Sequence, residues 1–210
     1  EYLFYHGLNS IAGFFDNGVD VFLQTRHRAL TEAIPDLCKG VEKLSRLSGI
    51  DLLSATIRGA LFANEADYSQ LITSRSDSTL WNDRVLLDES TAFITCLEQH
   101  SGQGDIHIIA DNAGHELCWD LVMVDALLRV FNTIRVIIHV KPWPMFVSDA
   151  LSLDVEETLN RFMNKNLSES ICLVGQRLRT AIDRDRLQIQ AEVDWGEPRH
   201  FNALDKTLGN

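Results

Sequence analysis

The chain has 210 residues with 45% hydrophobic and 23% charged side chains, and 30 acidic against 19 basic residues give it a net charge of -11. This length is enough to bury a hydrophobic core, as one large domain or two small ones. The negative charge argues against nucleic acid and against an anionic membrane surface as partners, because both would repel the chain.

The cysteines and the apolar runs indicate where the protein resides. The four cysteines are far apart and form no C-x-x-C pair, which argues against a structural zinc knot and gives no sign of a disulfide framework. No apolar run reaches the length of a membrane span, and no signal peptide pattern is present. We therefore expect a cytoplasmic protein that does not enter a membrane.

The first part of the chain has the pattern of helices. From Glu1 to about Thr73, apolar residues recur at three- and four-residue spacing, as on the buried face of a helix. Pro35 and Gly40 are expected to interrupt this pattern. Residues 1–100 are therefore predicted to form a mainly helical portion that contributes to the functional site.

After residue 100 the pattern changes to alternating strands and helices. Short β-branched runs at 105–111 and 134–140 predict two strands, and the helical pattern at 114–131 lies between them. This order predicts a βαβ unit with a right-handed parallel crossover. A further strand is predicted over 186–195. The fold class is α/β, with a parallel Rossmann-like sheet flanked by helices in residues 101–210.

Polar side chains follow both predicted strands at their carboxyl ends. Asp111 and Asn112 come directly after the first strand, while Lys141 and then Asp149 come after the second. Ligands of parallel α/β sheets collect at this edge, where loops meet the amino ends of helices. Two carboxylates and one carboxamide oxygen suit Mg²⁺ or Mn²⁺ better than structural zinc. The sequence thus points to a divalent-metal site with a lysine beside it.

Simpler interpretations of the same residues stay open at this point. An Asp-Asn-x-Gly sequence is often only a tight turn. Glu116, in the first turn of the following helix, is explained by compensation of the helix dipole. Lys141 is also compatible with an ordinary position at a strand end.

Three segments resemble motifs of the metal-dependent damage-control phosphatase family. They are "DNAGHELCWDLVMVDALL", "HVKPWPMFVSDA" and "ALFANEADYSQL", and they occur in the family's order. The closer resemblance is to the sugar-phosphate phosphatase branch, also described as acidic-residue methyltransferase-like. The opening "EYLFYHGL" is similar to that branch's N-terminal helix.

The resemblance implies roles for the strand-end residues. Asp111, Asn112 and Asp149 match the family's metal ligands, and the metal would be Mn, Mg, Co or Ni. Asp111 and Lys141 would be catalytic, with Lys141 offsetting phosphate charge.

Further residues match the family's substrate-binding positions. Glu116 matches an acid that contacts substrate or cofactor, and Ser148 belongs to the matching loop. Asn64 and Asp67 would line the site from the helical portion, and Lys141 would also hold the substrate. The substrate would be a phosphorylated small molecule such as a fructose phosphate, whereas the oligomeric state is not determined.

The family's later K-G-D-x-N-Y-R and R-T-x-K segments are not found before Asn210. The chain is then either a piece of a longer enzyme or a homologue that has lost part of its pocket and binds metal without turnover. A protein carboxyl methyltransferase using S-adenosylmethionine is a further alternative. It ranks lower because no glycine-rich loop follows the first strand.

Overall fold

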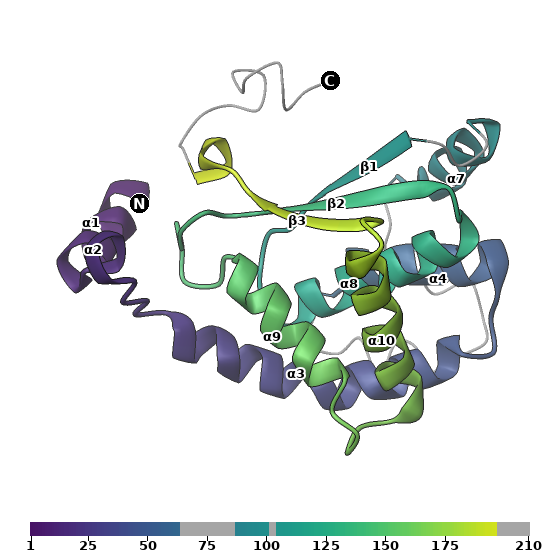
Figure 1. Ribbon diagram of the computed structural model, residues 1–210, viewed down its shortest axis with the longest axis horizontal. Helices are drawn as coiled ribbons and strands as arrows, with labels where there is room; N and C mark the ends of the chain where they lie inside the picture. The colour runs from purple at the N-terminus through teal and green to yellow at the C-terminus, as the bar shows by residue number, and fades with distance from the viewer. Residues whose placement is uncertain (64–86, 101–103, 197–210) are drawn as a thin grey trace.

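The computed structural model of the chain describes residues 1–63, 87–100 and 104–196 (Figure 1). The helices are α1 (Tyr2–Ala12), α2 (Phe14–Asn17), α3 (Leu23–Leu44), α4 (Gly49–Leu61), α7 (Ser90–Gln99), α8 (His115–Val130), α9 (Ser152–Phe162), α10 (Glu169–Asp183) and the 3-10 turn η1 (Val193–Gly196). The strands are β1 (Gly104–Ile109), β2 (Ile134–Val140) and β3 (Leu187–Ala191). The predicted α/β fold with a helical N-terminal portion is confirmed.

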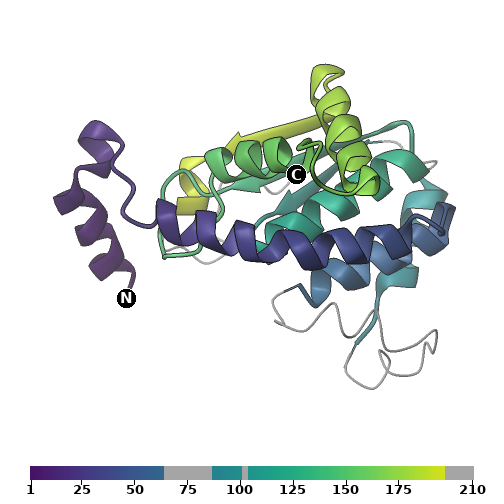
Figure 2. The same ribbon diagram turned by 90° about the horizontal axis from the view of Figure 1, so that it is seen from below.

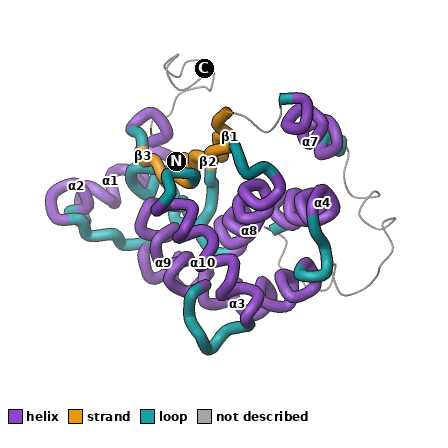
Figure 3. Tube along the Cα trace, turned by 45° about the vertical axis from the view of Figure 1, so that its right-hand side comes forward, coloured by secondary structure: helices purple, strands orange, loops and turns teal. Residues whose placement is uncertain are grey.

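The three strands form a parallel sheet in the order β1-β2-β3. The chain crosses the sheet in one direction, from β1 to β2 to β3. Because both crossovers have the same handedness, their connecting helices lie on the same face of the sheet. Figures 1 and 3 show this arrangement, with α8, α9 and α10 on one side of the strands. The carboxyl ends of β1 and β2 consequently open beside the amino end of α8.

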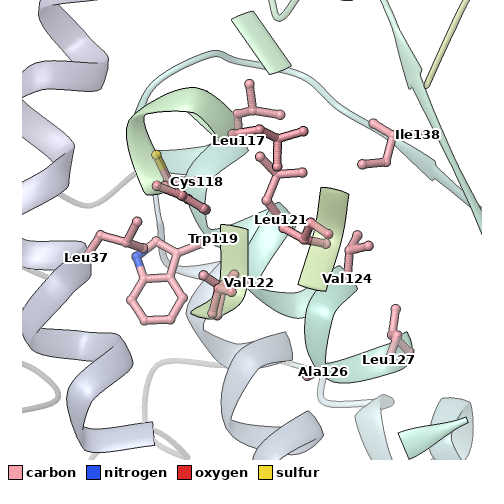
Figure 4. Packing of buried hydrophobic residues seen from close by; sticks show 14 of the residues in the cluster. Leu37, Leu117, Cys118, Trp119, Leu121, Val122, Val124, Ala126, Leu127 and Ile138 are labelled. Carbon is pink, nitrogen blue, oxygen red and sulfur yellow. The ribbon is translucent and has the colours of Figure 1, made fainter. Parts of the chain in front are cut away.

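Helix α8 is the centre of the hydrophobic core. Residues on almost all of its sides are buried, among them Leu117, Trp119, Leu121 and Leu127. It packs against the sheet and against α3, α4 and α10. Figure 4 shows Leu37 of α3 on one side of the α8 side chains and Ile138 of β2 on the other. The helical portion and the sheet thus share one core, while a domain boundary near residue 100 stays a prediction.

Pro35 and Gly40 do not interrupt the first long helix, contrary to expectation. Both lie inside α3, which is one helix of 22 residues. Pro35 cannot donate a hydrogen bond to the Thr31 carbonyl, but both residues are exposed, so water can satisfy that carbonyl. Burial of the apolar face of α3 against α8 and α10 outweighs the missing bond.

Only the first half of the strand predicted over 186–195 is a strand in the structure. β3 ends at Ala191, the partner of Val140, and η1 follows. Pro142 follows the end of β2 and has no N–H to donate, so the ladder cannot continue. Among the described residues, no helix is both long and apolar enough to cross a membrane.

Candidate active site

Two adjacent strand ends bring a lysine and an aspartate together. β1 and β2 are paired with Ile109 opposite His139, so Asp111 and Lys141 leave the sheet at the same level. The Lys141 ammonium donates to the Ala110 carbonyl at 3.0 Å and lies 3.3 Å from Asp111 Oδ1. The Lys141 side chain is 14% exposed and that of Asp111 72% exposed. The lysine is therefore held in place, while the carboxylate faces solvent.

The loop after β2 folds back onto the residues that follow β1. Asn112 and Asp149 form an isolated antiparallel bridge. The Ala150 N–H donates to the Asp111 carbonyl at 2.9 Å. Backbone bonds therefore hold Asp149 beside Asn112, although 37 positions separate them in the sequence.

Asp149 is a carboxylate in a low-dielectric environment. It is 3% exposed, and Oδ2 accepts a hydrogen bond from the Phe146 N–H at 2.8 Å. Burial raises the pKa of Asp149; the Phe146 N–H and Lys141 oppose the rise, whereas Asp111 adds to it. A nearby cation would stabilise the charged form of such a group.

Asn112 connects the other side chains of the site. Its amide group donates to both Glu116 oxygens at 3.1 Å and lies 3.3 Å from Asp111 Oδ2. Its carbonyl oxygen accepts from the Ser148 hydroxyl at 2.6 Å. That oxygen keeps a second lone pair. The structure thus brings together Glu116, Ser148 and the three predicted metal ligands.

Gly114 permits the close approach between α8 and α3. Its φ is 80°, which L side chains rarely adopt, and an added Cβ would lie 2.9 Å from the Ala29 Cβ. The glycine therefore sets how near the amino end of α8, with Glu116 in its first turn, can lie to α3.

Asp120 is an acid of this region to which the sequence analysis assigned no role. It lies one turn after Glu116 on α8, and the i, i+4 spacing is the signal that places both on one helix face. Burial, then Glu116 and Asp111, raise the pKa of Asp120 to about 7. Asp120 is therefore poised to exchange a proton near neutral pH.

The N-terminal helices support the loop that carries Asp149. The buried Asn9 donates from its side chain to the Pro144 carbonyl at 2.5 Å. The Tyr5 ring meets the Phe146 ring edge-on, with centroids 5.5 Å apart. In Figure 2, α1 and α2 stand apart from the main body. The contacts with the loop explain how this separate pair of helices contributes to the site.

The donor atoms fit a hard divalent cation. Among the described residues, no three His, Cys, Asp or Glu side chains are grouped as metal ligands. The predicted set contains only two carboxylates, Asp111 and Asp149, and its third donor is the Asn112 carboxamide. Burial and the nearby Asp111 disfavour the charged form of Asp149, and a bound cation would stabilise that form. Oxygen donors of this kind suit Mg²⁺ or Mn²⁺.

Two predicted substrate-binding residues cannot be placed. Asn64 and Asp67 lie outside the residues that the structure describes. Helix α4, which precedes them, ends at Leu61 and packs against α8. Their contribution to the site stays a prediction.

The fold and the strand-end residues define an α/β protein with an acidic, oxygen-rich site at the carboxyl edge of a parallel sheet. The chain belongs to the damage-control phosphatase ARMT1-like domain family, whose model matches residues 1–209. The resemblance drawn from the three motifs is thereby confirmed.

Relatives with the same family name are similar over part of their length. The chain is 39% identical over 102 residues to damage-control phosphatase ARMT1 of Xenopus tropicalis, covering 49% of this chain and 23% of that protein. It is 34% identical over 89 residues to the Danio rerio protein of that name, covering 39% and 20%. The Xenopus laevis protein is 25% identical over 170 residues, covering 73% and 39%. The chain therefore matches less than half the length of each relative.

Proposed function

We propose that the chain carries a divalent-metal-dependent phosphatase site for phosphorylated small metabolites, with sugar phosphates such as fructose phosphates as the first candidates. The observation that carries the proposal is the convergence of Asp111, Asn112, Asp149 and Lys141 at one edge of the sheet. The family and the names of the relatives support phosphatase chemistry.

Each side chain has a distinct task in this proposal. Asp111, Asn112 and Asp149 would hold the cation, which would supply Lewis-acid activation and neutralise phosphoryl charge. Lys141, fixed by the Ala110 carbonyl, offsets negative charge on the phosphoryl oxygens as the ester bond breaks. Both Glu116 oxygens accept hydrogen bonds from the Asn112 amide, which keeps the Asn112 oxygen directed away from Glu116.

Ser148 and the N-terminal helices position the site. The Ser148 hydroxyl, bonded to Asn112, can turn to donate to a substrate oxygen. Asn9 and Tyr5 hold the loop that presents Ser148 and Asp149. We also propose a cytoplasmic location, which the free state of all four cysteines supports.

Phosphate release tests the proposed function. The purified chain is incubated with fructose 1-phosphate or fructose 6-phosphate and Mn²⁺, Co²⁺, Ni²⁺ or Mg²⁺, and inorganic phosphate is measured. Asp111→Asn and Asp149→Asn should each lower the rate by about 100-fold or more, because each removes charge from the site. Lys141→Gln should lower the rate while leaving metal affinity nearly unchanged.

The control and the metal-binding measurement separate the possible outcomes. Asp183→Asn removes an exposed carboxylate at the far end of α10 and should retain full activity. Full activity in Asp111→Asn and Asp149→Asn would show that the site is wrongly assigned. Metal binding without phosphate release from any substrate would replace the proposal by a non-catalytic metal-binding homologue.

A further inference from the structure

We propose that a groove between α8 and α10, lined by arginines, binds a small phosphate-bearing anion at a site separate from the candidate active site. Two adjoining cavities of about 190 Å³ and about 400 Å³ form the groove. They share the four wall residues Asp125, Arg129, Leu173 and Arg177. The larger cavity falls within the range of roughly 300–1,000 Å³ typical of small-molecule sites.

The larger cavity is strongly basic in an acidic protein. Its described lining residues include four arginines and one acid, and they are Arg129, Arg177, Arg184, Arg186 and Asp125. These side chains leave a surplus of three positive charges, four minus one, whereas the whole chain carries -11. A concentration of positive charge against the sign of the whole molecule favours an anionic ligand.

The one acid is shared between two of the arginines. The Arg177 guanidinium donates to both oxygens of Asp125 at 2.7 Å. Arg129 lies 3.8 Å from one of the same oxygens. The Asp125 side chain is 5% exposed, and those of Arg177 and Arg129 are 38% and 44% exposed. Asp125 therefore holds Arg177 in position while both guanidinium groups keep donors on the groove side.

The other two arginines have no acid partner among the described residues. Arg186 donates to the carbonyls of Leu128 at 3.1 Å and Phe131 at 2.9 Å, at the carboxyl end of α8, and to the Ile134 carbonyl at 3.3 Å. The dipole of α8 places roughly half a negative charge at this end of the helix, which offsets only part of the positive charge of Arg186. Arg184 is exposed at the end of α10. Asp185, beside it in sequence, instead accepts a hydrogen bond from Gln188 at 2.8 Å and lies 3.9 Å from Arg135.

The chemistry of the walls indicates the class of ligand. Guanidinium groups match the oxygens of phosphate in paired hydrogen bonds. Gln176 and Thr180 add polar groups, and Leu128, Leu173 and Ala181 add an apolar wall. A ligand with one or two phosphate groups, either inorganic or carrying a small organic body, fits this combination.

The groove and the candidate active site lie at opposite ends of α8. Glu116 is in the first turn and Arg129 in the last turn of this 16-residue helix. The separation is about 20 Å along the helix axis, since each residue adds about 1.5 Å. One anion therefore cannot contact both sites.

Calorimetric titration of the whole chain tests the groove. Pyrophosphate is titrated in a buffer with a chelator and no added metal, so that binding does not depend on the metal site. We expect saturable binding that weakens as ionic strength rises. Arg129→Gln with Arg184→Gln should weaken it roughly ten-fold, because each change removes one exposed charge contact. Arg177 is left intact because its removal would leave the buried Asp125 carboxylate without its ion-pair partner.

Matched variants make the result decisive. Lys39→Gln with Lys165→Gln changes the net charge equally at exposed positions outside the groove and should bind as the wild type does. Lys141→Gln should also bind normally. Separate titrations with inorganic phosphate and with glucose 6-phosphate distinguish an inorganic ligand from an organic ester. No binding of any of the three probes, equal binding by the groove variant once its fold is verified by circular dichroism, or loss of binding in Lys141→Gln would each overturn the proposal.

Discussion

At the scale of single residues, the candidate site is a group of acids organised around one carboxamide. Asn112 donates to Glu116 and Asp111 and accepts from Ser148, so its orientation is determined by three neighbours. Asp149 and Asp120 lie in environments that raise the pKa of each. Because like charges and burial both disfavour the ionised forms, a bound cation would stabilise this group of residues.

The titration of Asp120 should be visible in the stability of the metal-free protein. Its pKa is about 7 in the folded chain, against a usual value of 3.8. Its contribution to stability is therefore complete below about pH 4 and is lost as the pH rises through 7. Asp120→Asn should raise the free energy of unfolding by roughly 1–3 kcal/mol at pH 8, and the gain should disappear near pH 4. Urea unfolding across this pH range measures the effect.

Asp88→Asn is the control, and its effect on the free energy of unfolding should have the opposite sign to that of Asp120→Asn. Hydrogen bonds from Ser90 lower the pKa of Asp88, so its contribution is present above the usual pKa and is lost as the pH falls. This variant should lose stability at neutral pH. An Asp120→Asn protein less stable than the wild type at pH 8 would show that Asp120 has a stabilising partner.

At the scale of elements, a buried ion-pair network connects α3 with α9 and with the segment before α3. The Arg26 guanidinium donates to Asp154 at 2.9 and 3.0 Å and to Asp20 on its other side. Asp154 also accepts from the Leu151 N–H at 2.9 Å. Leu151 follows the loop that carries Asp149, so the network fixes the far end of that loop.

Removal of Arg26 should be strongly destabilising. Arg26 and Asp154 have side chains that are 1% and 4% exposed, so Arg26→Ala leaves buried carboxylates without a cation. We expect a loss of about 3–5 kcal/mol in the free energy of unfolding. Arg28→Ala, two residues further along α3 and exposed, should change it by less than about 0.5 kcal/mol. Chemical denaturation compares the two, and equal losses would show that the network does not stabilise the fold.

At the scale of the whole molecule, α8 joins the two proposed ligand sites. Its amino end carries Glu116 and Asp120, its carboxyl end carries Arg129, and its middle is buried between the sheet and α3 and α4. A helix so enclosed moves with the core. Ligands at either end therefore act on the stability of the entire fold.

A divalent cation should raise the melting temperature of the whole chain. Mn²⁺ at about 100 times its dissociation constant would add about 2.7 kcal/mol to the free energy of unfolding. Differential scanning calorimetry should show this stabilisation in the wild type and in Asp183→Asn, but only a small part of it in Asp149→Asn. An identical rise in Asp149→Asn would place the cation elsewhere.

Much of the fold and part of the site could be predicted from local patterns. The strand over 134–140 and the helix after Gly114 were found because apolar periodicity reflects burial on one or more faces. The prediction that Pro35 interrupts α3 was wrong. The sequence displays the hydrogen bond that Pro35 cannot make, but it does not display the burial of α3 against other helices that offsets this loss. Asp120 was passed over because its raised pKa comes from burial and from neighbours that the sequence does not display.

The sequence by itself determined the α/β order, the family resemblance, the position of Asp111 and Asn112 at the end of the first strand, and the position of Asp149 in the loop after the second. These follow from periodicity and from motifs, which are properties of neighbouring residues. Only the tertiary structure decided that the loop after β2 returns to pair Asp149 with Asn112, that Glu116 bonds Asn112, and that four arginines line one cavity with Asp125. Most of these contacts join residues that are far apart in the sequence, and the local pattern of apolar and polar residues does not specify which distant segments meet.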